Sequence, residues 1–132
     1  MAYIKVTPGA PGIISLLSTY TDTAQSLNIF TQQILRGKSS LTEGERELIA
    51  AFVSGRNECK FCMRAHSAVA RKLLPPDQAG QVDKVIQQSD IKSLGAKMQA
   101  LLDIAAAVQQ GGKYVTKDQI ELAGSAGADD QA

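Results

Sequence analysis

Apolar residues recur every three or four positions along most of this chain, which is the period of an amphipathic α-helix. Two such segments, residues 11–19 and 22–36, come first, and Gly37 ends the second. The residues at 48–53 are almost all apolar and predict a buried helix that ends near Gly55. No segment has the sustained alternation of a β-strand. The pattern therefore predicts helices from residue 11 onward.

Capping and breaking residues mark the ends of the later helices. Thr42 to Glu45 and Thr116 to Gln119 have the spacing of a capping box, in which a threonine and the third helical residue bond each other's backbone. A further helix carries residues 59–74 and stops at a pair of prolines, the second of which opens a short helix through residue 86. A long helix is expected over 93–110, before two glycines.

These elements predict an all-α fold, a single-domain bundle of about six to seven helices over residues 1–132. A chain of 132 residues with 44% hydrophobic residues is long enough for one core. The polar residues 127–132 have two interpretations. They form a frayed tail, or they open a further helix of a longer chain, in which case the domain is truncated at its C-terminus.

Composition and charge exclude several classes of function. Fourteen basic and thirteen acidic residues give a net charge of +1, and no basic patch favours nucleic acid or an anionic membrane. No apolar run approaches the ~18 residues of a membrane span. The first residues lack the apolar stretch of a signal peptide, so we expect a cytoplasmic protein. No nucleotide, flavin or haem motif is present, and no cofactor is expected.

The two cysteines and the single histidine of the chain lie within eight residues of one another. Cys59 to Cys62 is a spacing of three, and Cys62 to His66 is a spacing of four, so on a helix all three share one stripe. Random scatter rarely produces this arrangement. In a reducing compartment a Cys-x-x-Cys pair is typical of redox or metal chemistry rather than of a structural disulfide.

A thiol has a pKa near ~8.5 and needs a base to act at neutral pH. His66 lies one turn from Cys62 and can be that base. A carboxylate would fix the tautomer of His66, and Glu47 on the preceding helix is the first candidate. Glu58 is a local rival that we expect to be solvated. The spacing favours attack on a peroxide by Cys62 and resolution by Cys59 to give a disulfide, but it leaves the reverse order open.

These residues resemble the Glu-x11-Cys-x2-Cys-x3-His signature of the alkylhydroperoxidase D (AhpD) proteins, in the carboxymuconolactone decarboxylase superfamily. The resemblance covers about residues 10 to 130. It implies a helical fold in trimers or hexamers, Cys62 as the peroxide-attacking thiol, Cys59 as the resolving thiol, and His66 with Glu47 as proton relay. The implied function is a thiol-dependent hydroperoxide reductase, an antioxidant enzyme reduced by an external lipoyl- or thioredoxin-like dithiol.

One departure from the family and three alternative functions remain. Some members have a second relay histidine between the cysteines, where this chain has Lys60 and Phe61. One alternative is a dithiol–disulfide oxidoreductase without peroxide specificity. Another is a metal-binding protein, although three ligands on one helix diverge rather than converge on a tetrahedron. The last is a structural subunit without chemistry.

Overall fold

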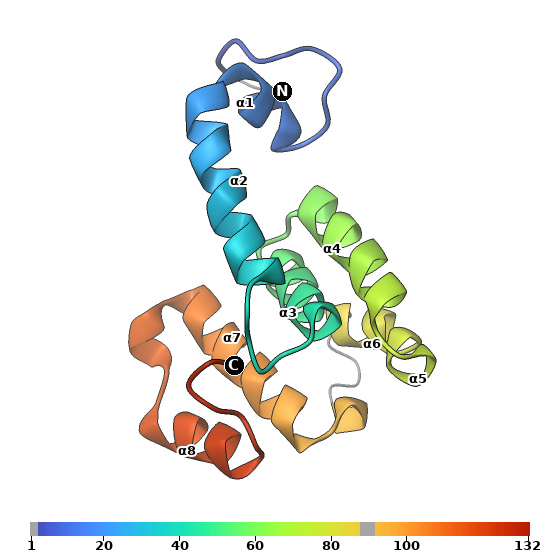
Figure 1. Ribbon diagram of the computed structural model, residues 1–132, viewed down its shortest axis with the longest axis vertical. Coiled ribbons are helices and arrows are strands. Elements are labelled where there is room, and N and C mark those ends of the chain that lie inside the picture. The colour runs from blue at the N-terminus through green and yellow to red at the C-terminus, as the bar shows by residue number, and fades with distance from the viewer. Residues whose placement is uncertain (1–2, 88–91) are drawn as a thin grey trace. The chain divides into compact units, whose positions relative to one another are not determined.

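The structure is a computed structural model that describes residues 3–87 and 92–132. All regular structure in these residues is helical, which confirms the predicted all-α class (Figure 1). None of the described helices is both long and apolar enough to cross a bilayer. The elements are α1 (Ile14–Thr19), α2 (Thr21–Arg36), α3 (Glu43–Arg56), α4 (Lys60–Leu73), α5 (Pro76–Ala79), α6 (Val82–Ile86), η1 (Lys92–Leu94), α7 (Ala96–Gln110), η2 (Gly112–Tyr114) and α8 (Lys117–Ser125).

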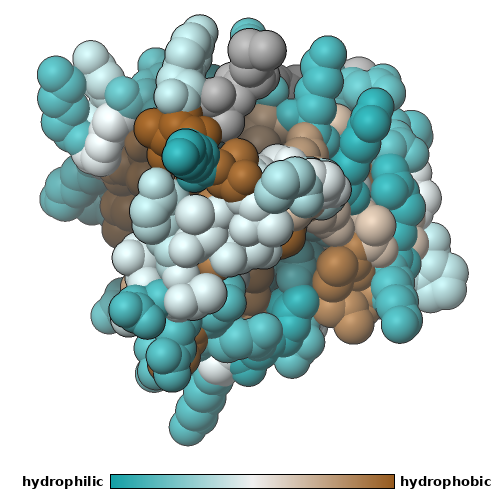
Figure 2. Space-filling model, turned by 90° about the horizontal axis from the view of Figure 1, so that it is seen from above, coloured by the Kyte–Doolittle hydropathy of each residue, from teal (hydrophilic) through white to brown (hydrophobic). Residues whose placement is uncertain are grey.

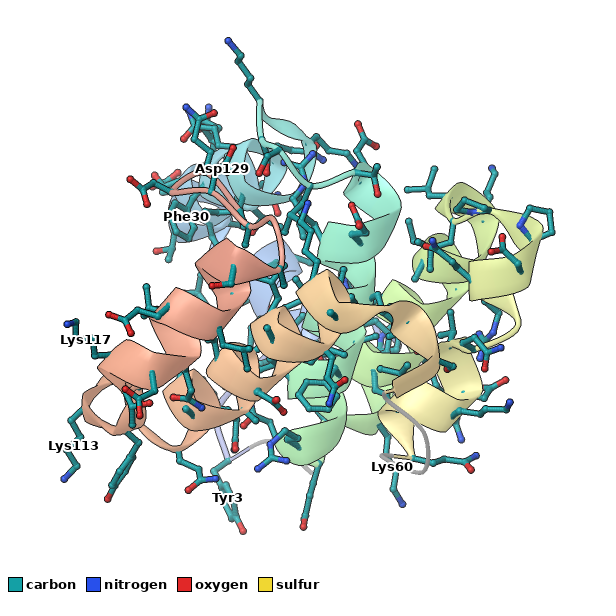
Figure 3. All side chains as sticks on the ribbon, turned by 90° about the horizontal axis from the view of Figure 1, so that it is seen from below. Tyr3, Phe30, Lys60, Lys113, Lys117 and Asp129 are labelled. Carbon is teal, nitrogen blue, oxygen red and sulfur yellow. The ribbon has the colours of Figure 1, made fainter. Side chains whose placement is uncertain are left out.

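The chain divides into two compact units, Met1–Lys38 and Ser39–Ala132, which are described separately. The single domain over 1–132 stays a prediction. In the first unit, most of the apolar side chains that predict α2 are exposed: Leu27, Ile29, Phe30 and Ile34. Phe30 is labelled in Figure 3, and Figure 2 shows apolar surface among the polar side chains of one face of the molecule.

The second unit is built around the antiparallel pair α3 and α4, which lie side by side (Figure 1). Both helices turn an apolar stripe inward, where α6 and α7 complete the core. Each large side chain buried there contributes roughly 1.5–3 kcal/mol. The buried core residues are Leu48, Phe52, Ala70, Leu74, Val82, Val85, Met98 and Leu102.

Local sequence signals set most of the helix ends. Both predicted capping boxes are present, at the starts of α3 and α8. The helix expected over 93–110 is divided, because Gly95 has a φ of 83° and separates η1 from α7. The single short helix expected after Pro76 is likewise two, α5 and α6, with a break at Gly80. This division brings the α-helices of the described residues to eight, one more than the upper expectation.

The C-terminal residues are held by the segment before α3. Ser40 Oγ donates a 2.6 Å hydrogen bond to Asp129 Oδ1, and Ser39 Oγ donates one of 2.9 Å to the Gln131 carbonyl. The bond from Ser40 lowers the pKa of the Asp129 carboxyl. These two bonds connect the C-terminal segment to the residues before α3.

Candidate active site

The turn between α3 and α4 places Cys59. The Cys59 N–H donates to the Ser54 carbonyl and the Glu58 N–H donates to the Gly55 carbonyl, both at 3.0 Å, which is the Schellman pattern of a helix C-terminus. This pattern needs a left-handed residue, and Glu58 takes that conformation with a φ of 56°. Cys59 then becomes the N-cap of α4. The prediction that Cys59 lies on the helix was wrong, because the Schellman turn ends one residue before α4 begins.

A side-chain contact from α7 secures this turn. Gln109 Nε2 donates a 2.8 Å hydrogen bond to Asn57 Oδ1, and Arg56 Nε donates to Gln109 Oε1 at 3.3 Å. Sequence reasoning missed Gln109, which is separated from Asn57 by 52 positions. No local signal in a single sequence points to such a contact.

The two cysteines contact each other at the start of α4. Both are free and half-buried, and the Cys62 backbone N–H donates to Cys59 Sγ at 3.4 Å. A hydrogen bond from the Cys62 side chain, supported by that amide, lowers the pKa of the Cys59 thiol. The same side-chain bond, followed by burial, raises the pKa of the Cys62 thiol. Of the two thiols, Cys59 is therefore the one that loses its proton more readily.

Glu47 of α3, which is buried, and His66 of α4, which is half-buried, form a carboxylate–imidazole pair. His66 Nδ1 lies 2.7 Å from Glu47 Oε2, and the Glu47 side chain is only 2% exposed. Burying a carboxylate is costly unless hydrogen bonds compensate it, which makes this pair a candidate for function. An ionised carboxylate only accepts, so Nδ1 carries the hydrogen and Nε2 is left as the base. The rival Glu58 is exposed in the turn.

Two cavities lie along α4 beside the cysteines. One, of about 300 Å³, is lined by Gly55, Glu58, Cys59, Lys60 and Met63. Lys60 is exposed, and its side chain extends away from the ribbon (Figure 3). The other cavity, of about 550 Å³, continues along the helix and is described below. Cys59 is the cysteine that lines a cavity here, and Cys62 lines neither of the two.

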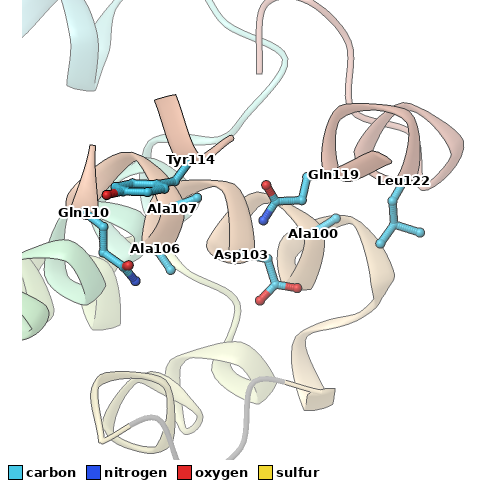
Figure 4. Close-up of a pocket in the computed structure, with 8 residues that line it drawn as sticks. All are labelled: Ala100, Asp103, Ala106, Ala107, Gln110, Tyr114, Gln119 and Leu122. Carbon is cyan, nitrogen blue, oxygen red and sulfur yellow. The ribbon is translucent and has the colours of Figure 1, made fainter. Parts of the chain in front are cut away.

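A separate cavity of about 390 Å³ is lined by α7, η2 and α8 (Figure 4). Its lining includes Asp103, Gln110 and Gln119, but no cysteine and no histidine. The side chain of Gln119 is already engaged in the capping box of α8. This cavity therefore offers no thiol and no base for the chemistry expected at α4.

The donor atoms of the candidate site do not gather as metal ligands. In the described residues, no three side chains of His, Cys, Asp or Glu are grouped so that they can hold a metal ion. Glu47 and His66 bond each other, and Cys59 accepts from the start of α4. The geometry thus favours thiol and proton chemistry at these four residues.

Comparison with known proteins supports the class suggested by this site. Residues 21–74, which contain Glu47, Cys59, Cys62 and His66, match the model of the carboxymuconolactone decarboxylase family. A solved structure, an uncharacterized peroxidase-related protein from Silicibacter sp. TM1040, is similar with a TM-score of 0.72 and 28% identity. The similarity covers 89% of this chain, which spans 62% of that protein. No curated protein matches the chain.

The family match and the structural likeness confirm the resemblance predicted from the sequence. The chain resembles AhpD-like proteins of the carboxymuconolactone decarboxylase type. The matched family includes decarboxylases, so the similarity alone does not decide the reaction.

Proposed function

We propose that this chain is a thiol-dependent hydroperoxide reductase, an antioxidant enzyme that works through Cys59, Cys62, His66 and Glu47. One observation carries the proposal: a buried Glu47 carboxylate 2.7 Å from the ring of His66, which lies one turn from Cys62 in a contacting cysteine pair. Base, orienting carboxylate and two thiols are the parts that peroxide reduction needs. The likeness to a peroxidase-related protein agrees with it.

The reaction begins with proton transfer from the Cys62 thiol to Nε2 of His66. The Cys62 thiolate attacks the peroxide, the O–O bond breaks, and an alcohol leaves with the proton while Cys62 becomes a sulfenic acid. The Cys59 thiolate then attacks the sulfenic sulfur, the S–O bond breaks, and the Cys59–Cys62 disulfide forms; the hydroxide that leaves takes up a proton from solvent and becomes water. An external dithiol, of lipoyl or thioredoxin type, reduces the disulfide and is itself oxidised.

The pKa directions of the two thiols fit these roles. The raised pKa of Cys62 means that it needs a base before it attacks, and His66 is the base within one turn. The lowered pKa of Cys59 favours the thiolate that the second step requires. The same directions also suit the reverse order, in which Cys59 attacks first, so the order has to be measured.

A second candidate function is a dithiol–disulfide oxidoreductase without peroxide specificity. It is favoured by the position of Cys59, an N-cap thiol with a lowered pKa beside an open cavity. Such a thiol attacks disulfides readily. The two functions differ in the oxidant and not in the residues.

We also propose that the protein is cytoplasmic and forms a homo-oligomer, a trimer or hexamer by the family resemblance. The exposed apolar side chains of α2, with Phe30 59% exposed, support association because such stripes are normally covered. Native mass spectrometry should detect assemblies, and Phe30→Glu should shift them toward monomer. A monomeric wild-type protein at micromolar concentration would contradict this proposal.

Free-thiol counting tests the main proposal directly. Reduced protein is treated without oxygen with one equivalent of cumene hydroperoxide, and its thiols are titrated before and after. We expect both thiols to be lost and a dithiol to restore them. Cys62→Ser should abolish sulfenic acid formation, whereas Cys59→Ser should stop at that stage on Cys62. Two thiols still free after prolonged exposure would exclude the peroxidase, and a rapid loss with a disulfide alone would favour the second candidate.

A further inference from the structure

The two cavities along α4 adjoin each other at shared residues. Gly55 and Met63 line both of them. Together they form a groove, called here the α4 groove, that runs from Cys59 past Met63 to Ser67 and Arg71. Residues 59, 63, 67 and 71 are spaced by four, so they follow one side of the helix. The groove volumes of about 300 and 550 Å³ lie in the range of small-molecule sites.

Three cationic side chains line this groove, Lys60 beside Cys59 and, farther along α4, Arg64 and Arg71. Arg71 also lines the groove, but its guanidinium is paired with Asp83. Arg64 is exposed and, among the residues that the structure describes, has no ion-pair partner. It lies in the second turn of α4, five positions after the N-cap Cys59. A guanidinium without an ion-pair partner that lines the same groove as a reactive sulfur suits a ligand with a carboxylate.

We propose that the α4 groove binds a further reductant beside the external dithiol, a small thiol that carries a carboxylate, held by Arg64, and that its thiolate attacks Cys59. The inference rests on the proposed function, because it needs the Cys59–Cys62 disulfide. It goes beyond that function by assigning the reductant's chemical class and the sulfur that it attacks.

The Cys59–Cys62 disulfide is reduced by thiol–disulfide exchange. The thiolate of the reductant forms a bond to Cys59 Sγ, the Cys59–Cys62 bond breaks, and the electron pair leaves on Cys62 Sγ. Cys62 takes up a proton, which agrees with the raised pKa of its thiol. A second molecule of the thiol then attacks the reductant's sulfur in the mixed disulfide and releases Cys59 as thiolate. Two thiols are oxidised to one disulfide, and one protein disulfide is reduced.

Access decides which sulfur is attacked. Attack requires an approach to the sulfur along the disulfide bond, and Cys59 lines the groove whereas Cys62 does not. The junction of the groove is open because residue 55 is a glycine. A Cβ there would lie 3.5 Å from Ile86 Cγ2 and 3.7 Å from Met63 Sδ, which is ordinary contact within the fold. Gly55→Ala therefore fills the junction without strain.

The test compares two thiols of equal length, 3-mercaptopropionate and 3-mercapto-1-propanol. The protein is oxidised with diamide, so that the disulfide forms without a peroxide, and its reduction rate constant is measured by mass spectrometry after quenching. Rates are expressed per thiolate. Arg64→Gln should slow the anionic thiol about two- to five-fold and leave the neutral one unchanged. Lys72→Gln removes an equally exposed charge outside the groove and should change neither rate.

Two further variants test the path and the sulfur. Gly55→Ala should slow reduction by both thiols, and in Cys62→Ser the disulfide of 3-mercaptopropionate should form a mixed disulfide on Cys59. An Arg64→Gln effect equal for both thiols, or none, would overturn the proposal, as would an unreactive Cys59. If hydroperoxide fails to oxidise Cys59 and Cys62 but Arg64→Gln still slows the anionic thiol alone, the peroxidase function is contradicted and the proposed role of the groove is supported.

Discussion

The two sides of α4 have different surroundings, although the residues on them are neighbours in sequence. On one side, His66 faces a buried carboxylate on α3. On the other side, Met63 and Arg64 line open cavities. His66 and Arg64 are two residues apart, which on a helix turns their side chains about 160° away from each other. The carboxylate of the proposed proton relay is thereby buried, while ligands can approach the opposite side through open cavities.

Cys59 belongs to both sides because it is not part of the helix. As N-cap it contacts Cys62 and also lines a cavity. The difference between the two sides is one of burial: the carboxylate that orients the proposed base is buried, whereas the cavities on the other side are open to solvent. A substitution on one side should therefore change the pH dependence of the reaction, and a substitution on the other side should change how readily a ligand reaches Cys59.

The largest effect should come from the buried side. Glu47→Gln removes the charge that holds the Nδ1 hydrogen of His66, and we expect oxidation by hydroperoxide to slow about 100-fold. The loss should be accompanied by a changed pH profile, since the base is no longer fixed in one tautomer. Stopped-flow measurement of sulfenic acid formation between pH 5 and 9 gives both quantities.

Glu58→Gln is the matched control for this change. It removes the same charge one residue from Cys59, but in an exposed turn. We expect less than a two-fold change in rate and an unchanged pH profile. Equal losses in the two variants would mean that the general negative charge near the thiols matters, and not the bond between Glu47 and His66.

A smaller effect should appear in the titration of the thiols. The pKa of Cys59 lies below its ordinary value of 9.0, so alkylation of Cys59 by iodoacetamide should persist to lower pH than for an ordinary cysteine. Cys62→Ala removes the side chain that bonds Cys59, so the midpoint should rise toward 9.0. Peptide mass spectrometry follows each site. A midpoint that stays unchanged in Cys62→Ala would show that the backbone N–H of residue 62 is sufficient.

Local sequence patterns were enough for much of the fold. Both capping boxes, the helix start at Pro76 and the stop at Gly111 depend on neighbouring residues, and all four were predicted correctly. The pair Glu47 and His66 was also anticipated, because a helix and a short turn separate them and antiparallel helices bring such positions together. Their catalytic roles stay predictions.

The start of α4 and the α4 groove were not predictable in this way. The helical spacing of Cys59, Cys62 and His66 includes a residue that precedes the helix, because Cys59 is the N-cap of α4. A Schellman turn usually has a glycine in the left-handed position, whereas this chain has Glu58 there. The bond from Gln109 to Asn57 joins distant segments and has no local pattern. The groove depends on α6 packing beside α4, a tertiary contact that periodicity does not encode.

The smallest predicted effect concerns the turn between the two sides. A non-glycine residue in the left-handed region costs roughly 1–2 kcal/mol, and Glu58 pays this cost with a φ of 56°. Glu58→Gly relieves it but adds conformational freedom to the unfolded chain, worth about 0.4–1 kcal/mol. The free energy of unfolding should therefore rise by several tenths of a kcal/mol up to about 1.5 kcal/mol, as measured by urea titration of the reduced protein.

Lys72→Gly should have the opposite effect on stability, because it puts a glycine into the last turn of α4 at an exposed position. It should lower the free energy of unfolding by up to about 1 kcal/mol. If Glu58→Gly lowers stability as much as Lys72→Gly, the turn is not strained, and the left-handed Glu58 would have to be stabilised by its own contacts. If stability rises while the rate of disulfide formation is unchanged, the turn positions Cys59 through its backbone bonds alone, and the Glu58 side chain has no part in the site.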